Sequence, residues 1–158
     1  MREESGVKSQ ELGVTLLEIL VTLGILFVLA TIGVGAVSNF RKHSLLDEAR
    51  ARVLAESNFA RSQTLGSEEN SAWGVHFEAS RIVRFKGEVF LSADPSNREV
   101  LLPSGTKISS ISLLGGSSDV VFERLTGRVA NFGTITIELT SDSSQQVVIT
   151  VHASGGTE

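Results

Sequence analysis

The 158-residue chain has no cysteine and no tyrosine, only two prolines, and a shortage of positive charge. Without cysteine it can form no disulfide framework, thiolate metal site, Fe–S cluster or cysteine nucleophile. Its 14 Lys and Arg residues are outnumbered by 18 Asp and Glu residues, so the formal net charge is −4. This balance argues against a general binder of nucleic acid or of anionic membranes. The length predicts one domain with at most a small appendage.

Apolar residues are concentrated near the N-terminus, in residues 14–37. The mean hydropathy is +0.16 although 20% of the residues are charged, and no charge follows Glu18 before Arg41. Because a helix needs about 20 apolar residues to cross a hydrocarbon core of ~30 Å, this segment is predicted to span a membrane. A cleaved secretory signal is the alternative, with residues 33–36 as the candidate small-residue cleavage site.

Glu18 is the exception within this apolar segment. A carboxylate inside a spanning segment costs roughly 2.5–3.5 kcal/mol. One interpretation places Glu18 at the hydrated membrane edge. The other gives it a partner: if the chain were cut before Val14, the new α-amino group would lie one helical turn from Glu18. That cation could pair with the carboxylate of a neighbouring subunit and offset the burial of both charges.

Residues 13–18, Gly-Val-Thr-Leu-Leu-Glu, followed by the apolar run, resemble the prepilin processing site of type IV pilins and type II secretion pseudopilins. The resemblance implies a leader that ends at Gly13. A membrane prepilin peptidase would cleave after Gly13 and methylate Val14, and Glu18 would guide assembly. Two features depart from the family pattern. Val14 stands where Phe is usual, and the leader carries two basic against three acidic side chains, so the orientation rests on the resemblance alone.

A second helical stretch is predicted at residues 38–65, which contain neither Pro nor Gly. Leu45, Ala49 and Val53 recur every four residues, which is typical of an amphipathic helix packed on one side. Gly66 is the predicted stop. Joined to the apolar segment, this helix would be ~75 Å long at 1.5 Å per residue.

From Trp73 onward the apolar pattern alternates with a period of two residues, which is typical of strands. Turn residues separate the segments, and their spacing predicts an antiparallel β-sandwich or paired sheets. The predicted strands cover residues 73–78, 82–86, 88–91, 99–102, 107–114, 120–125, 134–139 and 146–151.

Residues 58–65, 73–77 and 122–137 resemble the GspH/FimT-like minor pilins, in which a helix leads into two small antiparallel sheets. The predicted fold class is therefore α+β and pilin-like. A long N-terminal helix with a membrane-spanning first half would pack on an antiparallel, sandwich-like C-terminal domain. The predicted divisions are a leader at 1–13, the transmembrane and assembly half of the helix at 14–37, its amphipathic half at 38–65, a β-rich domain at 66–152 and a flexible tail at 153–158.

No catalytic, cofactor or metal site is predicted. His43, His76 and His152 are scattered, and no HExxH, GxSxG, Walker A or GxGxxG motif is present. Asp119 and Asp142 lie near Ser-rich turns, where capping of the turn is a better interpretation than calcium binding.

DNA binding is the main functional alternative, because some FimT-like pilins bind DNA through basic residues. Arg81, Arg84 and Lys86 cluster, and Arg124 and Arg128 flank a turn. Yet residues 66–158 hold seven basic against eleven acidic side chains. Since phosphate binding needs neutralising cations, we interpret these residues as a solvated face.

The sequence thus predicts a minor pseudopilin or pilin subunit rather than an enzyme. It would be a single-pass protein of the bacterial inner membrane with a periplasmic C-terminal domain, assembled into a periplasmic or surface filament for type II protein secretion. Its expected partners are prepilin peptidase, other pilin or pseudopilin subunits, the inner-membrane assembly platform, and a secreted substrate or the secretin. The alternative is a FimT-like minor type IV pilin that binds DNA for transformation or supports pilus assembly.

Overall fold

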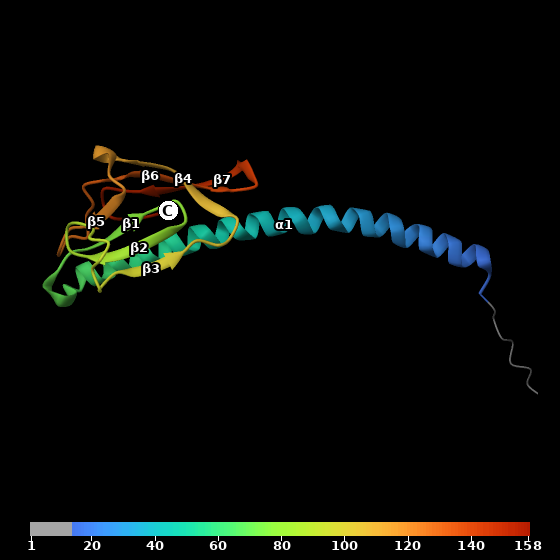
Figure 1. Ribbon diagram of the computed structural model, residues 1–158, viewed down its shortest axis with the longest axis horizontal. Coiled ribbons are helices and arrows are strands. Elements are labelled where there is room, and N and C mark those ends of the chain that lie inside the picture. Colours follow the sequence, from blue (N-terminus) through green and yellow to red (C-terminus); the bar gives the residue numbers. More distant parts are fainter. Residues whose placement is uncertain (1–13) are drawn as a thin grey trace, which may run out of the picture. The chain divides into compact units, whose positions relative to one another are not determined.

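The computed structural model describes the backbone of residues 14–158 and the side chains of residues 14–30 and 40–158. The predicted leader at 1–13 lies outside the described residues. The chain divides into two compact units, Met1–Asn39 and Phe40–Glu158. All strands belong to the second unit, and helix α1 contributes residues to both (Figure 1).

Helix α1 comprises Leu16–Leu65. Within the second unit, its buried apolar side chains recur at helical spacing, as expected for a helix that packs on one side. These residues are Leu46, Ala49, Val53 and Ala60. The helix ends at the predicted stop, where the Gly66 N–H donates to the Ser62 carbonyl at 2.9 Å and Ser67 takes a left-handed conformation with φ 50°.

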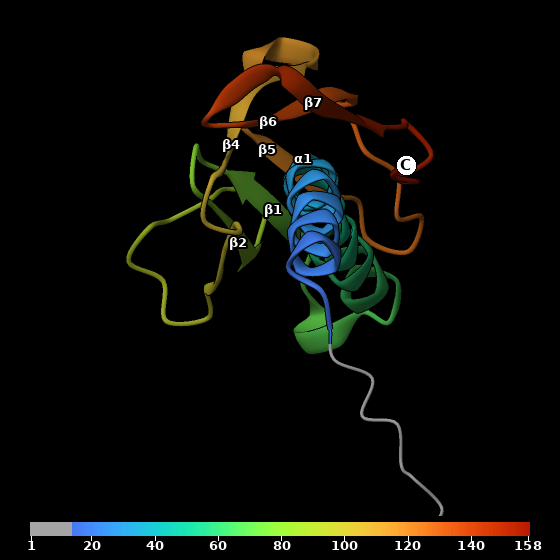
Figure 2. The same ribbon diagram turned by 90° about the vertical axis from the view of Figure 1, so that its right-hand side faces the viewer.

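In the described residues, seven strands form two sheets, which Figure 2 shows as separate layers. All neighbouring strands pair antiparallel, which confirms the predicted antiparallel sheet domain. The first sheet, in the order β3-β2-β1-β5, consists of β1 (Trp73–Phe77), β2 (Arg81–Lys86), β3 (Arg98–Leu101) and β5 (Asp119–Phe122). The second, in the order β4-β6-β7, consists of β4 (Thr106–Leu113), β6 (Gly133–Leu139) and β7 (Asp142–Val151). Two short 3-10 helices, η1 (Glu68–Asn70) and η2 (Leu114–Gly116), lie in the connections.

One hydrophobic core joins α1 to both sheets within the second unit. Both sheets and the helix contribute side chains that are fully buried, among them Val53, Val75, Phe122 and Ile137. Gly74 is required where β1 passes beneath Phe85, because a Cβ there would lie 2.6 Å from the Phe85 ring.

Residues 88–91, predicted as a strand, form part of the loop between β2 and β3. The reason is tertiary packing. Phe90 stacks on the His76 ring with the two ring centroids 4.0 Å apart, and it meets Phe85 edge to face at 5.5 Å. The loop therefore covers the outer face of β2, which explains why Ile82 and Val83 are both buried although they lie on opposite faces.

Polar contacts supplement the core between α1 and the sheets. Arg84 donates to Glu56 at 3.0 Å, and its guanidinium lies 4.0 Å above the Phe59 ring. The Thr64 hydroxyl accepts the Trp73 backbone N–H at 3.0 Å, so the end of the helix is bonded to the start of β1.

Among the described residues, no helix combines the length and apolar content needed to cross a membrane. The predicted membrane-spanning first half of the helix is therefore wrong, and so is the predicted fold class that includes it. The predicted single-pass location in the inner membrane is wrong for the same reason. Spanning needs about 20 consecutive apolar residues. Within the described part of the chain, the acidic Glu18 interrupts the apolar run in the first turn of α1.

Candidate functional site

The three residues that the sequence analysis assigns to processing and assembly lie at or before the start of α1. Gly13 lies outside the described residues. Val14 precedes the helix and is exposed, and Glu18 lies in its first turn and is also exposed.

A local hydrogen bond fixes the start of the helix. The Thr15 hydroxyl accepts the Glu18 backbone N–H at 3.2 Å, and the Thr15 carbonyl accepts the N–H of Ile19 at 3.2 Å. Thr15 is thus the N-cap, and Thr-x-x-Glu is the sequence of a capping box. A carboxylate at this position also interacts favourably with the helix dipole. This structural role of Thr15 and Glu18 was not predicted from the sequence, although the spacing of the two residues signals it.

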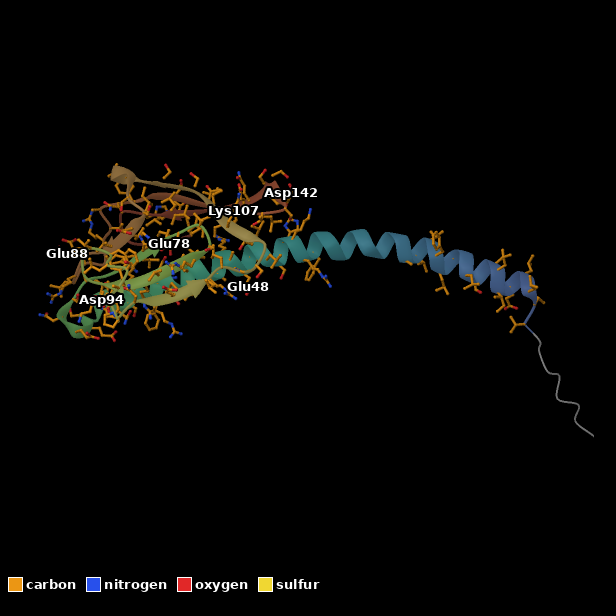
Figure 3. The ribbon with its side chains drawn as sticks, in the orientation of Figure 1. Glu48, Glu78, Glu88, Asp94, Lys107 and Asp142 are labelled. Atoms are coloured by element: carbon orange, nitrogen blue, oxygen red, sulfur yellow. The ribbon has the colours of Figure 1, made fainter. Side chains whose placement is uncertain are left out.

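Beyond this turn, α1 exposes apolar side chains on all sides (Figure 3). The large apolar side chains between Leu16 and Leu29 have exposed fractions from 49% to 83%. Between Glu18 and Leu29 the one polar side chain is that of Thr22. Its hydroxyl donates to the Ile19 carbonyl at 2.9 Å, so its hydrogen bond is made within the helix. A helix that is apolar all round is ordinarily buried.

This arrangement can drive association with other apolar surfaces. Removing apolar surface from water contributes about 25 cal/mol per Å², and the stretch from Leu16 to Leu29 offers it without a polar face. Glu18 is the one charged residue in this stretch. On association its carboxylate would lose its hydration, which is costly unless it pairs with a cation.

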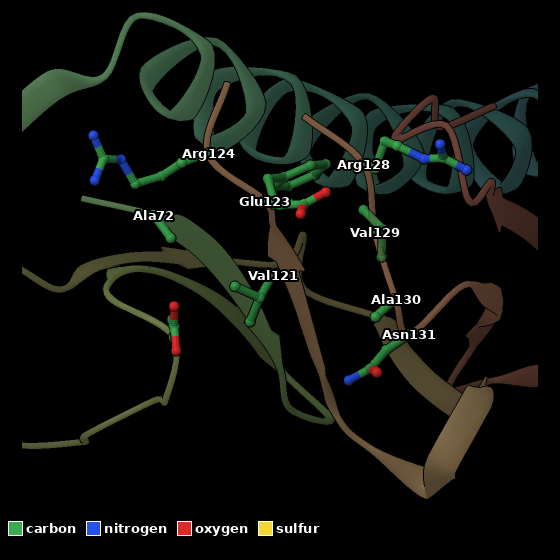
Figure 4. A pocket seen from close by; sticks show the side chains of 10 residues that line it. Ala72, Val121, Glu123, Arg124, Arg128, Val129, Ala130 and Asn131 are labelled. Atoms are coloured by element: carbon green, nitrogen blue, oxygen red, sulfur yellow. The ribbon is translucent and has the colours of Figure 1, made fainter. Parts of the chain in front are cut away.

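The second unit carries a pocket of about 730 Å³ beside edge strand β5. Figure 4 shows its wall formed by Val121 of β5 and by the returning segment at Val129 and Ala130. Two arginines, Arg124 and Arg128, line the pocket together with two glutamates, so positive and negative side chains are present in equal number. Arg124 donates to the Asn70 side chain. This mixture does not select an anion or a cation.

The basic cluster that the DNA-binding alternative would use is paired with carboxylates. Arg81 contacts Glu78 at 2.7 Å, and Arg84 contacts Glu56 at 3.0 Å. Lys86 contacts the carboxylate of Glu69. Burial of Arg84 is the main reason that the pKa of its guanidinium lies below its ordinary value. These contacts leave less positive charge available to phosphates than the sequence alone indicates.

The three histidines are not brought together. His76, in β1, contacts Asp119 at 2.5 Å, and His152 contacts Glu158 at 2.9 Å. His43 lies on α1. Within residues described by the structure, no group of three or more His, Cys, Asp or Glu side chains could hold a metal ion. Asp142 caps its turn by accepting the Ser144 hydroxyl at 2.6 Å.

Comparisons with protein families, with curated proteins and with solved structures found no match.

Proposed function

We propose that this chain is a pilin or pseudopilin subunit that assembles with other subunits through the helical stretch from Leu16 to Leu29. The observation that carries the proposal is the exposure of large apolar side chains all around this stretch. Packed side by side, such helices would bury each other's apolar surface, which lone subunits leave exposed. The resemblance of residues 13–18 to prepilin processing sites supports the same role.

Processing explains how Glu18 would be accommodated in such an assembly. Cleavage after Gly13 by a prepilin peptidase would create an α-amino group at Val14. This cation would pair with Glu18 of a neighbouring subunit among the packed helices. The absence of cysteine favours a type II secretion pseudopilin, because many type IV pilins close a C-terminal loop with a disulfide.

The test compares cleavage and filament incorporation for the wild type, Gly13→Glu and Glu18→Gln, each coexpressed with a prepilin peptidase and partner subunits. Glutamine retains the capping-box geometry with Thr15 but removes the charge, so Glu18→Gln separates assembly from helix capping. Intact mass reports cleavage, and sedimentation of sheared filaments reports incorporation. Glu48→Gln, an exposed carboxylate on the same helix, is the matched control.

We expect the wild type and Glu18→Gln to start at Val14, and Gly13→Glu to keep its leader. Incorporation of Glu18→Gln should fall at least ~10-fold, because leaving one charge of a buried pair unpaired costs about 3–5 kcal/mol. Incorporation of Glu48→Gln should match the wild type. Normal incorporation of Glu18→Gln, or a Val14 N-terminus in Gly13→Glu, would overturn the proposal.

A further inference from the structure

Backbone strain in the described part of the chain is concentrated in two loops of the second unit, residues 66–72 between α1 and β1 and residues 123–128 after β5. The non-glycine residues with positive φ are Ser67, Glu69 and Asn70 in the first loop and Leu125 in the second. Their φ angles run from 50° to 68°, a left-handed conformation that is unfavourable for residues with a side chain. Strained residues persist where the surrounding structure holds them, and they cluster at sites that bind ligands.

Hydrogen bonds hold each loop in place and join the two. In the first loop the Asn70 N–H donates to the Ser67 carbonyl at 2.9 Å. In the second loop the Gly127 N–H donates to the Glu123 carbonyl at 2.8 Å. Arg124 of the second loop donates to the Asn70 side chain of the first. A surface that is already ordered loses little conformational entropy when it binds a partner.

The pocket beside β5 lies against both loops. Ala72 ends the first loop and Glu123 begins the second, and both line the pocket. Apolar side chains at Val121 and Val129 form its wall (Figure 4). Its volume of about 730 Å³ lies within the range of ~300–1,000 Å³ that is usual for ligand sites. The strained loops and the pocket thus occupy one place in the second unit.

The edge of β5 at this pocket presents the backbone N–H of Val121. In the antiparallel pair of β1 and β5, the Phe77 N–H donates to the Ser118 carbonyl at 2.9 Å. Hydrogen-bonded and non-hydrogen-bonded residue pairs alternate along such a ladder, so Val121 falls in a non-hydrogen-bonded pair with Gly74. Its N–H therefore points away from β1.

The segment that returns past β5 does not take up this N–H. Phe122 and Val129 form an isolated antiparallel bridge, which puts the Ala130 carbonyl opposite the Val121 N–H. The chain bends at Ala130 and Asn131, and within the described residues no hydrogen bond joins the two groups. A peptide group offers one acceptor and one donor, which is the complement of this N–H and this carbonyl.

Four charged side chains at the pocket form no ion pair within the part of the chain that the structure describes. They are Glu88, Glu123, Arg124 and Arg128. Most other basic side chains of the second unit contact carboxylates. A partner that carries both an acidic and a basic side chain complements the four charges, whereas a simple anion or cation would also meet its own sign.

We propose that this pocket binds an extended peptide segment of a partner protein. One peptide group of the segment bonds the Val121 N–H and the Ala130 carbonyl, and an apolar side chain packs on the wall of the pocket. Flanking acidic and basic side chains meet the arginines and the glutamates. Main-chain bonds beside a strand, combined with pockets for side chains, are a recurring mode of peptide recognition. The site lies wholly within Phe40–Glu158, so it does not depend on assembly through the N-terminal stretch of α1.

The single tryptophan gives a signal for occupancy of the pocket. Trp73 follows Ala72 in the chain, and its indole N–H donates to the Glu68 carbonyl of the first loop at 3.4 Å. The full-length protein is titrated with acetyl-Glu-Val-Leu-Val-Lys-amide or with its neutral counterpart, acetyl-Gln-Val-Leu-Val-Gln-amide, while Trp73 fluorescence is followed. Ala130→Phe fills the pocket, and Ala93→Phe, at an exposed alanine of the loop before β3, is its matched control.

We expect saturable binding of the charged peptide, about 3-fold tighter than that of the neutral peptide, because exposed ion pairs contribute modestly. Ala130→Phe should weaken binding at least ~10-fold, and Ala93→Phe should leave it unchanged. Arg128→Gln should weaken binding of the charged peptide by about 3-fold without affecting the neutral one, a pattern that misfolding would not produce. Arg98→Gln on β3 is the control for this change. No saturable binding to the wild type, or equal weakening by the two phenylalanine variants, would rule the proposal out.

Discussion

At the scale of single residues, backbone conformation identifies positions where the fold constrains the sequence. Gly155 passes so close to the backbone of Gly127 that a Cβ would lie 1.8 Å from the Gly127 carbonyl oxygen. Arg61 of α1 donates to the same carbonyl at 3.4 Å. At Leu125 the residue type does not suit the backbone. Leu125 takes φ 68°, and its side chain is 74% exposed, so no packing requires a leucine there.

Replacing Leu125 with asparagine should therefore stabilise the protein. The left-handed conformation costs an ordinary residue about 1–2 kcal/mol, and asparagine tolerates it better. We expect Leu125→Asn to raise the free energy of unfolding by up to ~1 kcal/mol in urea denaturation. Leu114→Asn is the control, since Leu114 is also exposed but lacks a positive φ. An equal gain in both variants would show that backbone strain at Leu125 is not the cause.

At the scale of elements, the two parts of helix α1 differ in how their apolar side chains are buried. Its residues from Phe40 onward bury a stripe against the sheets, whereas the stretch from Leu16 to Leu29 exposes apolar side chains on all sides. Stability of the second unit therefore depends on the core that it forms itself. Within that core, β6 is the central strand of its sheet and buries Ile135, Ile137 and Leu139.

Shortening one of these side chains should be costly. Ile137 is fully buried, so Ile137→Ala leaves a cavity and should lower the free energy of unfolding by about 2–5 kcal/mol. Leu101→Ala on the edge strand β3 should change it by less than about 0.5 kcal/mol, because Leu101 is 63% exposed. Urea titrations followed by Trp73 fluorescence measure both. Similar losses in the two variants would argue against the described core.

At the scale of the whole molecule, ion pairs couple the stability of the fold to pH. Hydrogen bonds from Arg81 hold the pKa of Glu78 below its ordinary value of 4.5. The Ser144 hydroxyl and then Lys42 hold the pKa of Asp142 below its ordinary value of 3.8. Both carboxyls return to ordinary pKa values on unfolding, so the unfolded chain binds protons first as the pH falls.

Stability from these two groups is thus present above about pH 5 and is lost as the pH falls through their folded-state pKa values. The double variant Glu78→Gln/Asp142→Asn should lose less stability than the wild type between pH 5 and pH 2.5, although it starts from a lower value. Urea midpoints measured across this range test the prediction. Parallel curves for the two proteins would show that these carboxyls do not contribute to acid unfolding.

Much of the secondary structure could be predicted from local patterns, because helix and strand periodicity and turn residues act over a few positions. The stop at Gly66 and the antiparallel strands are examples. The false strand at residues 88–91 shows the limit, because Phe90 is held by His76 of β1, which no local pattern encodes. Of the candidate site, Glu18 could be identified as the charge in an apolar run, but its hydrogen bond with Thr15 was missed.

The sequence alone determined the absence of thiol chemistry, the acidic balance and the concentration of apolar residues before Arg41, since these depend only on composition and order. The hydropathy of residues 14–37 did not determine a membrane span, because spanning depends on a continuous apolar helix of sufficient length. Tertiary structure decided which basic side chains are paired with carboxylates and which strand edges are protected. Those outcomes depend on residues distant in the sequence, as when Arg52 of α1 donates to the Leu101 carbonyl of β3.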